Sequence, residues 1–301
     1  MHGFYGKRSL NLRGTTTISM RISQLKKQFS VQLEGEFPST EIMSFFYILT
    51  EEYLGMQKVD IALNPTQEIS KEEQTKFESA LNRLKKHEPI QYITGNTEFF
   101  TRKFLVNKSV LIPRPETEEL VEWIISDHRS TGQELKILDI GTGSGCIPIS
   151  LAKELEDAKV SSFDISSEAL LIAKRNAKLN AADVLFRKLN ILEAEELEGQ
   201  FDIIVSNPPY VRELEKKEMH QNVLDHEPKL ALYVEDENAL IFYKKIAELA
   251  VKSLNPAGCL YFEINQYLAE ETKSLVQQFG FETELKKDIF GHYRMLKATK
   301  Q

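Results

Sequence analysis

Apolar residues between positions 20 and 86 recur every three or four places, which is the spacing of one helix face. The stripes consist of Ile22, Leu25, Phe29 and Leu33; then Ile42, Phe45, Phe46, Leu49, Tyr53 and Leu54; then Phe77, Leu81 and Leu84. Ser39 or Thr40 is expected to cap the second helix, and Ser70 and Glu73 have the spacing of a capping box before the third. We therefore expect residues 20–86 to form a small helical domain that buries its stripes against one another.

Residues 87–118 have the pattern of a connecting segment. The stretch from Glu98 to Leu105 mixes aromatic residues with Thr and charge, which predicts a short hairpin. Pro113 and Pro115 hold the chain extended, because each disfavours helix at the residue before it. A helix over Glu116–Asp127 is expected to start at Pro115 or just after it. Such a segment can be a plain rigid linker or a wall of a substrate site, and both interpretations stay open.

Strand-like and helix-like patterns alternate in the remainder, residues 119–301. Strands are expected at 135–140, 160–164, 201–206 and 259–264, and helices at 147–155, 169–179, 239–254 and 268–279. Two further strands, Phe281–Leu285 and Tyr293–Ala298, have a short connection and should be antiparallel to each other. The alternation predicts an α/β fold with a doubly wound, mainly parallel sheet.

Composition and charge exclude several classes of protein. The 301 residues are 42% hydrophobic and 28% charged, which is typical of a globular chain. No run approaches the ~20 apolar residues of a membrane helix, and the net charge of −7 argues against a general duplex-DNA binder. Two cysteines, Cys146 and Cys259, cannot build a disulfide scaffold or a four-thiolate zinc site, so no metal is expected. A cytoplasmic enzyme fits this composition.

The first nineteen residues differ from the rest of the chain. They contain Lys7, Arg8 and Arg13 but no acidic residue, and glycines interrupt any amphipathic helix. We expect residues 1–19 to be a disordered extension, with Met20 opening the folded part.

A glycine-rich loop separates the first expected strand of the sheet from the following helix. Its residues are Gly141, Thr142, Gly143, Ser144 and Gly145. Glycines let backbone N–H groups approach a ligand closely, but this loop lacks the later glycine of the NAD fingerprint and the Lys-Ser/Thr of a P-loop. Asp164 closes the next strand, where an acid can accept both hydroxyls of a ribose. Asp139 precedes the loop and can orient it. Two acids would repel a pyrophosphate and tolerate a sulfonium, so the sequence favours S-adenosylmethionine over NAD.

A second motif, Asn207-Pro208-Pro209-Tyr210, follows the expected strand 201–206. Pro-Pro pairs are usually turns, but this pair lies where open α/β sheets bind ligands. The prolines remove two N–H donors, so the Pro208 carbonyl and the Asn207 amide oxygen are left as neighbouring acceptors. Tyr210 offers a flat face for stacking. Two acceptors and a flat face suit a planar amino group.

These motifs together resemble a known family. The run from Ile137 to Gly145, with Asp164 and the Asn207–Tyr210 motif, resembles class I S-adenosylmethionine-dependent methyltransferases of planar amino groups. The segments EPIQYITGNTEFF (88–100), VLIPRPETEELVE (110–122), HEPKLAL (226–232) and DIFGHYR (288–294) are similar to the release factor glutamine methyltransferases of the HemK/PrmC type. The resemblance implies methylation of the glutamine amide nitrogen in the Gly-Gly-Gln motif of peptide chain release factors. It also implies a Rossmann-like domain preceded by a helical domain.

The resemblance assigns roles to individual residues. It places the loop from Gly141 to Gly145 along the methionine part of the cofactor and Asp164 on its ribose. The motif Asn207–Tyr210 would hold the substrate glutamine, with Asn207 also bordering the cofactor. The family often has Asp near the adenine, where this sequence has Asn190 and Ile191; Asn can still accept a hydrogen bond there. We expect the N-terminal helical domain to recognise the protein substrate.

Two alternatives come from other classes. The same motif could grip adenine or cytosine in DNA or rRNA, although the acidic charge and the lack of a Lys/Arg-rich arm count against nucleic-acid binding. The second alternative is a degenerate, non-enzymatic domain that only binds proteins. The intact Asp164 and the intact Asn207–Tyr210 motif count against it.

Overall fold

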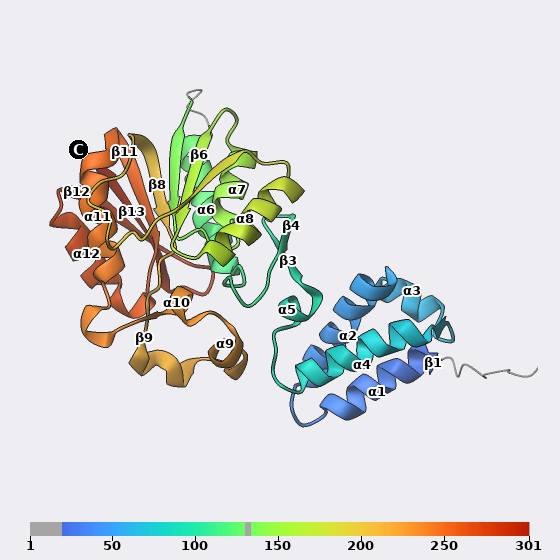
Figure 1. The fold of residues 1–301 in the computed structure, drawn as a ribbon. Helices are drawn as coiled ribbons and strands as arrows, with labels where there is room; N and C mark the ends of the chain where they lie inside the picture. The colour runs from blue at the N-terminus through green and yellow to red at the C-terminus, as the bar shows by residue number, and fades with distance from the viewer. Residues whose placement is uncertain (1–19, 130–133, 301) are drawn as a thin grey trace, which may run out of the picture. The chain divides into compact units, whose positions relative to one another are not determined.

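The computed structural model describes residues 20–129 and 134–300 of the chain. The expected disordered extension over residues 1–19 lies outside these described residues. The chain divides into two compact units, of which one ends at Lys86 and the other begins at His87 (Figure 1). The connecting segment 87–118 therefore groups with the sheet that follows it.

Residues 20–86 fold into helices with one short strand pair. The elements are α1 (Ile22–Leu33), α2 (Ser39–Leu54), α3 (Lys58–Leu63), α4 (Lys71–Leu84), β1 (Met20–Arg21) and β2 (Glu68–Ile69). The Phe29 ring lies 5.6 Å from the Phe46 ring and 6.0 Å from the Phe77 ring, both edge to face. These rings come from the three predicted stripes, so the expected helical packing is confirmed.

The two expected helix caps have different outcomes. Ser70 Oγ accepts from the Glu73 backbone N–H at 3.2 Å and Glu73 accepts from the Ser70 N–H at 2.7 Å, so the capping box is confirmed. The expected cap at Ser39 or Thr40 is wrong, because α2 is preceded by Pro38 and has no side-chain cap. The extended Pro38 already supplies the carbonyl that accepts the first helical N–H groups, which makes Ser39 the first helical residue.

The second unit contains an α/β sheet domain with a hairpin before it. Its larger elements are α5 (Ile90–Thr94), β3 (Asn96–Phe99), β4 (Arg102–Leu105), α6 (Pro115–His128), β5 (Lys136–Ile140), α7 (Cys146–Glu154), β6 (Lys159–Asp164), α8 (Ser167–Leu179), β7 (Val184–Lys188), β8 (Phe201–Ser206), α11 (Ile241–Ser253), β11 (Leu254–Glu263), α12 (Ala269–Gln277), β12 (Phe281–Lys287) and β13 (Tyr293–Lys300). Shorter ones between β8 and α11 are β9 (Val211–Arg212), α9 (Gln221–His226), α10 (Lys229–Leu232) and β10 (Tyr233–Val234).

Strands of the described residues form a sheet in the order β12-β13-β11-β8-β5-β6-β7. The strands from β11 to β7 are parallel, whereas β13 is antiparallel to both β11 and β12. Helices cover both faces of this sheet (Figure 1). The predicted doubly wound, mainly parallel sheet with antiparallel C-terminal strands is confirmed.

Alternate residues of the central strands face two different apolar layers. The layer that includes α11 and α12 contains Leu138, Ile204 and Phe262, and the layer that includes α6 and α7 contains Ile137, Ile203 and Tyr261. Because both faces are buried, these strands appear in the sequence as continuous apolar runs.

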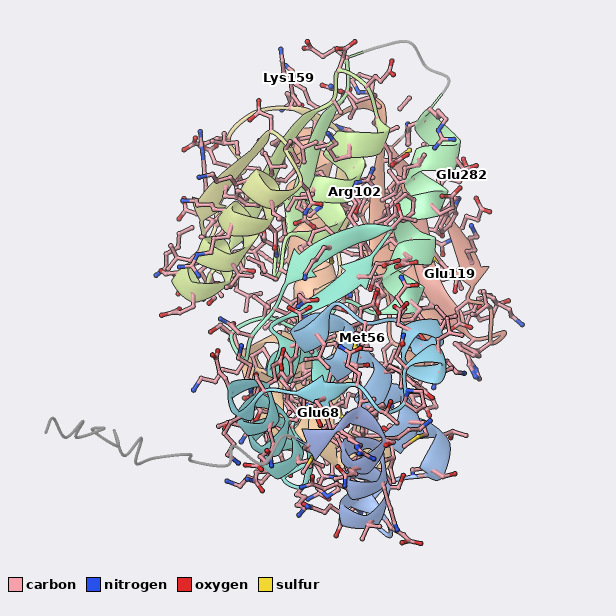
Figure 2. All side chains as sticks on the ribbon, turned by 90° about the vertical axis from the view of Figure 1, so that its right-hand side faces the viewer. Met56, Glu68, Arg102, Glu119, Lys159 and Glu282 are labelled. Atoms are coloured by element: carbon pink, nitrogen blue, oxygen red, sulfur yellow. The ribbon has the colours of Figure 1, made fainter. Side chains whose placement is uncertain are left out.

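The hairpin predicted near residues 98–105 is formed by β3 and β4. Its backbone is tied to the sheet domain by Asn176 of α8, which accepts from the Leu105 N–H at 2.7 Å and donates to the Leu105 carbonyl at 2.9 Å. Arg102, labelled in Figure 2, forms an ion pair with Glu154 of α7 at 2.6 Å. The hairpin is therefore fixed on the surface of α7 and α8.

Some elements lacked a sequence signal. Strand β7 is an edge strand whose residues are half-buried or exposed, so it shows no apolar run. Helix α11 begins at Ile241 instead of the expected residue 239, because residues 236–238 form a 3₁₀ turn. None of the helices in the described part of the chain combines the length and the apolar character that crossing a membrane requires.

Candidate active site

A cavity of about 440 Å³ lies at the carboxyl ends of β5, β6 and β8. Gly141, Asp164 and Asn207, at or just after those strand ends, all line it. Strand β5 lies between β6 and β8, so the chain runs to one side of β5 and later returns on the other. Ligands of open α/β sheets bind at such a reversal of strand order, and the volume suits a small molecule.

The glycine loop connects β5 directly to α7. Gly141, Gly143 and Gly145 have φ of 88°, 54° and 84°, a region that glycine adopts at little cost. Residues 141–144 line the cavity, but Gly145 does not. A Cβ on Gly145 would lie 2.9 Å from Ile149 Cδ1 and 3.2 Å from Ala173 Cβ. Gly145 therefore serves the close packing of α7 against α8, which shapes the loop.

Asp164 holds the glycine loop from the neighbouring strand. One carboxylate oxygen accepts from the Gly143 N–H at 2.9 Å, and the other accepts from the Ser166 N–H at 2.8 Å. Burial raises the pKa of Asp164, and these backbone hydrogen bonds oppose that rise. Asp164 also lines the cavity, so its carboxylate can both order the loop and meet a ligand.

Asp139 lies beneath the cavity and does not line it. Its side chain is fully buried, with Oδ2 accepting from the Ser162 hydroxyl at 2.6 Å. Among the described residues, Oδ1 has no hydrogen-bond partner. Burial raises the pKa of Asp139 to about 7, and the nearby Asp164 adds to the rise. Asp139 can thus influence a ligand through its charge and through Ser162, whose hydroxyl contacts that of Thr142.

Asn190 and Ile191 both line the cavity, in the segment after β7. The Asn190 side-chain oxygen accepts from the Leu192 N–H at 3.2 Å, which fixes the side chain beside its own backbone. A contact of either residue with adenine remains a prediction.

The Asn207–Tyr210 motif follows β8, and only part of it reaches the cavity. Asn207, Pro208 and Pro209 line the cavity, whereas Tyr210 packs against the apolar layer that includes α11. The Tyr210 hydroxyl donates to Glu263 Oε1 at 3.0 Å. Stacking of Tyr210 on a ligand therefore stays a prediction. The hydroxyl of Tyr210 contacts Glu263 and so helps to hold the motif in place.

Glu263 and Thr117 form a buried polar pair beside the motif, and Thr117 also lines the cavity. Thr117 Oγ1 donates to Glu263 Oε2 at 2.6 Å, and the Asn207 side-chain nitrogen donates to Thr117 Oγ1 at 3.3 Å. The exposed fractions of Thr117 and Glu263 are 3% and 1%. Burial raises the pKa of Glu263, and its bonds from Thr117 and Tyr210 oppose the rise.

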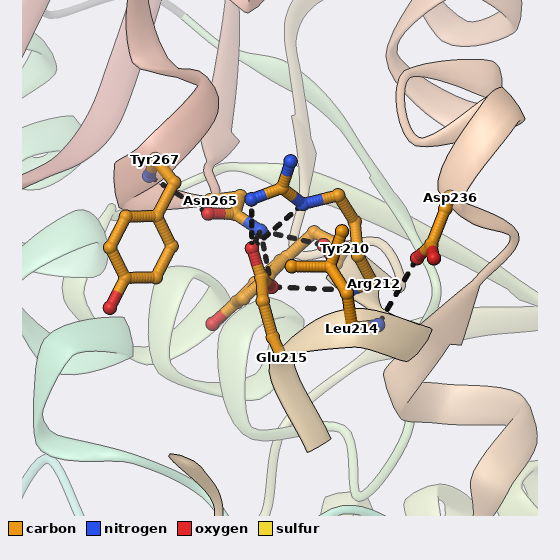
Figure 3. Close-up of polar contacts among 7 residues, drawn as sticks. All are labelled: Tyr210, Arg212, Leu214, Glu215, Asp236, Asn265 and Tyr267. Carbon is orange, nitrogen blue, oxygen red and sulfur yellow. Dashed lines mark hydrogen bonds and ion pairs between the residues drawn. The ribbon is translucent and has the colours of Figure 1, made fainter. Parts of the chain in front are cut away.

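A second polar group holds the backbone of the motif (Figure 3). Asn265 Nδ2 donates to the Tyr210 carbonyl at 2.9 Å and to Glu215 Oε2 at 2.9 Å. Arg212 Nε donates to Glu215 Oε1 at 2.8 Å. Because Glu215 is buried, this ion pair with Arg212 neutralises a charge that would otherwise be costly.

The proline-stiffened segment forms one wall of the cavity. Leu111, Pro113 and Arg114 line it, and α6 begins at Pro115 as predicted. Arg114 forms an ion pair with the buried Glu227 at 2.5 Å, and Glu227 also accepts from the Ile112 N–H at 3.2 Å. The segment is therefore both a rigid connection and a wall. Within residues 20–129 and 134–300, no cluster of three or more His, Cys, Asp or Glu is placed to hold a metal ion.

Comparison with protein families matches two parts of the chain. Residues 24–95 match the PrmC N-terminal domain, and residues 118–231 match the methyltransferase small domain. The release factor glutamine methyltransferase of Flavobacterium psychrophilum is 53% identical over 93% of this chain and 99% of its own length. That of Bacteroides thetaiotaomicron is 46% identical over 89% of this chain and 96% of its own. This chain belongs to the release factor glutamine methyltransferase family.

The resemblance found in the sequence is thus confirmed, and the fold of this family member is shared more widely. A solved methyltransferase structure from Pyrococcus furiosus is 21% identical, with a TM-score of 0.50, and the match covers 74% of this chain and 98% of that one. At that identity the likeness concerns the fold alone.

Several residues around the site of this family member were not assigned a role from the sequence. Thr117 and Glu227 lie inside the motifs 110–122 and 226–232, whose pattern assigns no role to either residue. Glu263 ends an apolar strand run, and Asn176 lies on the buried face of α8. A polar residue at a position whose neighbours are buried is the signal that could have found the last two, because such groups need partners.

Proposed function

We propose that the chain methylates the side-chain amide nitrogen of the glutamine in the Gly-Gly-Gln motif of peptide chain release factors. The observation that carries this proposal is the pair of hydrogen-bond acceptors at Asn207 and Pro208, beside a cavity that the glycine loop also lines. The relatives named release factor glutamine methyltransferase support the choice of substrate.

The acceptors suit a primary amide. The Asn207 side-chain nitrogen is engaged with Thr117, and among the described residues no hydrogen bond to Asn207 Oδ1 is present. Pro208 and Pro209 have no N–H, so donors that would compete for the substrate are absent at these two positions. Asn207 Oδ1 and the Pro208 carbonyl can then accept the two hydrogens of one planar –NH2 group.

The residues around the cavity fit S-adenosylmethionine. Residues 141–144 of the glycine loop line the cavity and can lie along the methionine part, while the Asp164 carboxylate can meet the ribose. Asn190 lies on the side proposed for the adenine. The Asp139 carboxyl below the loop has an unpaired oxygen and a raised pKa, and a bound cation would favour its ionised form. When bound, this cofactor supplies an electrophilic methyl group on a sulfonium.

Positioning is the main contribution of the protein to the reaction. An amide nitrogen is a poor nucleophile because its lone pair is delocalised into the carbonyl. Acceptance of both hydrogens by Asn207 and Pro208 holds the nitrogen and directs its lone pair, and correct orientation can contribute ~7–11 kcal/mol. As the nitrogen gains a methyl group it takes on positive charge and becomes acidic, and it releases one proton past these acceptors to water. Apolar side chains such as Ile147, Phe242 and Ile246 help to exclude water.

The decisive measurement is mass spectrometry of a recombinant release factor after incubation with this chain and the cofactor. One added methyl on the motif glutamine is expected, and DNA and rRNA tested in parallel should gain none. Asn207→Ala should lower turnover about hundredfold or more while cofactor affinity stays the same. Asn255→Ala is a matched control, because Asn255 and its partner Asp202 lie at the amino ends of β11 and β8, away from the cavity at the carboxyl ends. Methylation of nucleic acid alone, or near-normal turnover by Asn207→Ala, would refute the proposal.

The proposal includes a role for the helical unit, residues 20–86, in recognising the protein substrate, because a glutamine on a loop offers little surface for specificity. Deletion of this unit should raise the KM for the release factor far more than the KM for the cofactor. Equal increases in both would contradict the assignment. Since release factors act on ribosomes, the proposal also includes a cytoplasmic location.

A further inference from the structure

Three polar side chains from distant parts of the second unit form one chain of hydrogen bonds that ends at Asn207. Thr117 lies in the first turn of α6, and Glu263 is the last residue of β11. Thr117 Oγ1 donates to Glu263 at 2.6 Å, and Asn207 donates to Thr117 at 3.3 Å. Thr117 and Glu263 are almost completely buried, and Thr117 also lines the cavity beside Asn207.

The direction of these hydrogen bonds follows from the number of hydrogens available. A threonine hydroxyl has one hydrogen, and a short bond to a carboxylate is the stronger of its two contacts. Glu263 also accepts from the Tyr210 hydroxyl at 3.0 Å, so each of its oxygens has a donor. Thr117 therefore offers only a lone pair to Asn207. A lone pair attracts the amide nitrogen of Asn207 and repels its oxygen.

We infer that Thr117 and Glu263 are positioning residues that determine which way the Asn207 amide faces. Their arrangement turns the nitrogen of Asn207 toward Thr117 and leaves Oδ1 for the cavity. If the amide were reversed, Asn207 would present its own –NH2 to the substrate –NH2, and two donors would face each other. This inference rests on the proposed function only in assigning a substrate amino group, since the orientation of Asn207 is a property of the chain itself.

The surrounding frame keeps Glu263 in place. The Tyr243 hydroxyl donates to the Glu263 backbone carbonyl at 3.1 Å. Two residues further along, Asn265 holds the Tyr210 carbonyl, as Figure 3 shows. The end of β11 thus fixes the Asn207–Tyr210 motif through the side chain of Glu263 and through the backbone of Tyr210.

The kinetic test compares Thr117→Val, which keeps the shape and removes the hydroxyl, with Thr117→Ser, which keeps the hydroxyl. Thr117→Val should lower kcat about tenfold to hundredfold with cofactor affinity within about twofold of normal, and Thr117→Ser should retain most of kcat. Thr272→Val is the matched control, since it removes an equally buried hydroxyl, bonded to the Leu268 carbonyl, from α12. A normal kcat for Thr117→Val, or a loss that Thr117→Ser shares, would overturn the inference.

Glu263→Gln tests the direction of the bonds. A glutamine nitrogen can donate to Thr117, whose own hydrogen is then free to point at Asn207 and attract Oδ1. We expect Glu263→Gln to lower kcat as Thr117→Val does, and the double variant to be no worse than either single one. Additive losses would mean that the two residues act separately and would overturn the inference.

A spectroscopic measurement separates this inference from the proposed function. The side-chain –NH2 resonances of Asn207, assigned by their disappearance in Asn207→Asp, report its hydrogen bond directly in the full-length protein. They should shift in Thr117→Val and stay in place in Thr117→Ser. Resonances that do not move in Thr117→Val would overturn the inference, whatever substrate the enzyme accepts. Absence of release factor methylation with the expected shifts would instead refute only the proposed function.

Discussion

The two sides of the cavity are built in different ways. The glycine loop depends on its own backbone: positive φ at three glycines, and the absence of a side chain on Gly145 where α7 meets α8. The Asn207 side depends on residues far away in the sequence, since Thr117 is 90 positions from Asn207 and 146 from Glu263. The loop is therefore held by elements close to it in the sequence, with Asp164 only 21 positions from Gly143, and the Asn207 side by elements much further away.

The two motifs therefore differ in how far along the chain their partners lie. The glycine loop needs positive φ at its glycines and contacts from the next strand and the helix that follows it, where Asp164 and Ala173 lie. The Asn207 side-chain amide has two orientations of nearly the same shape, and the hydrogen-bonding groups around it determine which one forms. Substitutions should accordingly affect stability and cofactor binding on the loop side, and turnover on the Asn207 side.

The largest effect on the loop side is expected for Gly145→Ala. The new Cβ would meet Ile149 and Ala173 at a positive φ, so the free energy of unfolding should fall by about 2–5 kcal/mol and cofactor affinity should fall with it. Gly143→Ala is the matched control, because no atom lies within 4 Å of its added Cβ. Calorimetric unfolding of the two variants checks this. An equal loss in both would show that packing between α7 and α8 is not the reason for Gly145.

A smaller effect should come from Asp139, through pH. Burial raises the pKa of Asp139 from 3.8 to about 7, so the folded state holds its proton more tightly than the unfolded state. Stability contributed by this group is therefore lost as pH rises from about 4 through about 7, and the loss is complete above that range. Asp139→Asn should gain stability relative to the original protein between pH 4 and pH 8, by a difference on the order of 4 kcal/mol. A stability difference that is constant between pH 4 and 8 would contradict this.

The smallest effect is expected on the Asn207 side, for Asn265→Ala. The variant removes the donor to the Tyr210 carbonyl and one partner of Glu215, while Arg212 still neutralises Glu215. Stability should fall by about 1 kcal/mol. Turnover should fall several-fold with unchanged cofactor affinity, because the motif backbone becomes less fixed. Steady-state kinetics, with cofactor binding measured separately, would check this. A loss of cofactor affinity without a loss of turnover would contradict the prediction.

Strong, regular patterns made most of the fold predictable. Buried runs such as 135–140 and 201–206 indicated the central strands, because residues buried on both faces are apolar throughout. Strand β7 was missed because only the full sheet identifies it as an edge. The cap of α2 was wrongly placed because Ser39 is a favourable cap by type, yet Pro38 already occupies that position in the backbone.

The site was predictable as a set of residues and much less as an arrangement. The sequence indicated that Asp164 and Asn207 follow strand ends, and parallel strands bring such ends together. It could not show that Tyr210 turns its hydroxyl to Glu263, or that Asp139 lies below the cavity wall.

Periodicity and backbone restrictions act over a few neighbouring residues, so the sequence pattern is enough to predict the helical unit, the doubly wound sheet, the glycine-rich turn and the diproline motif. The hydrogen-bond partner of each buried polar group depends on the complete fold, since those partners come from separate elements. The orientation of Asn207 belongs to this second class. The orientation of its amide is determined by Thr117 on α6 and Glu263 on β11, which come into contact only when the sheet is complete.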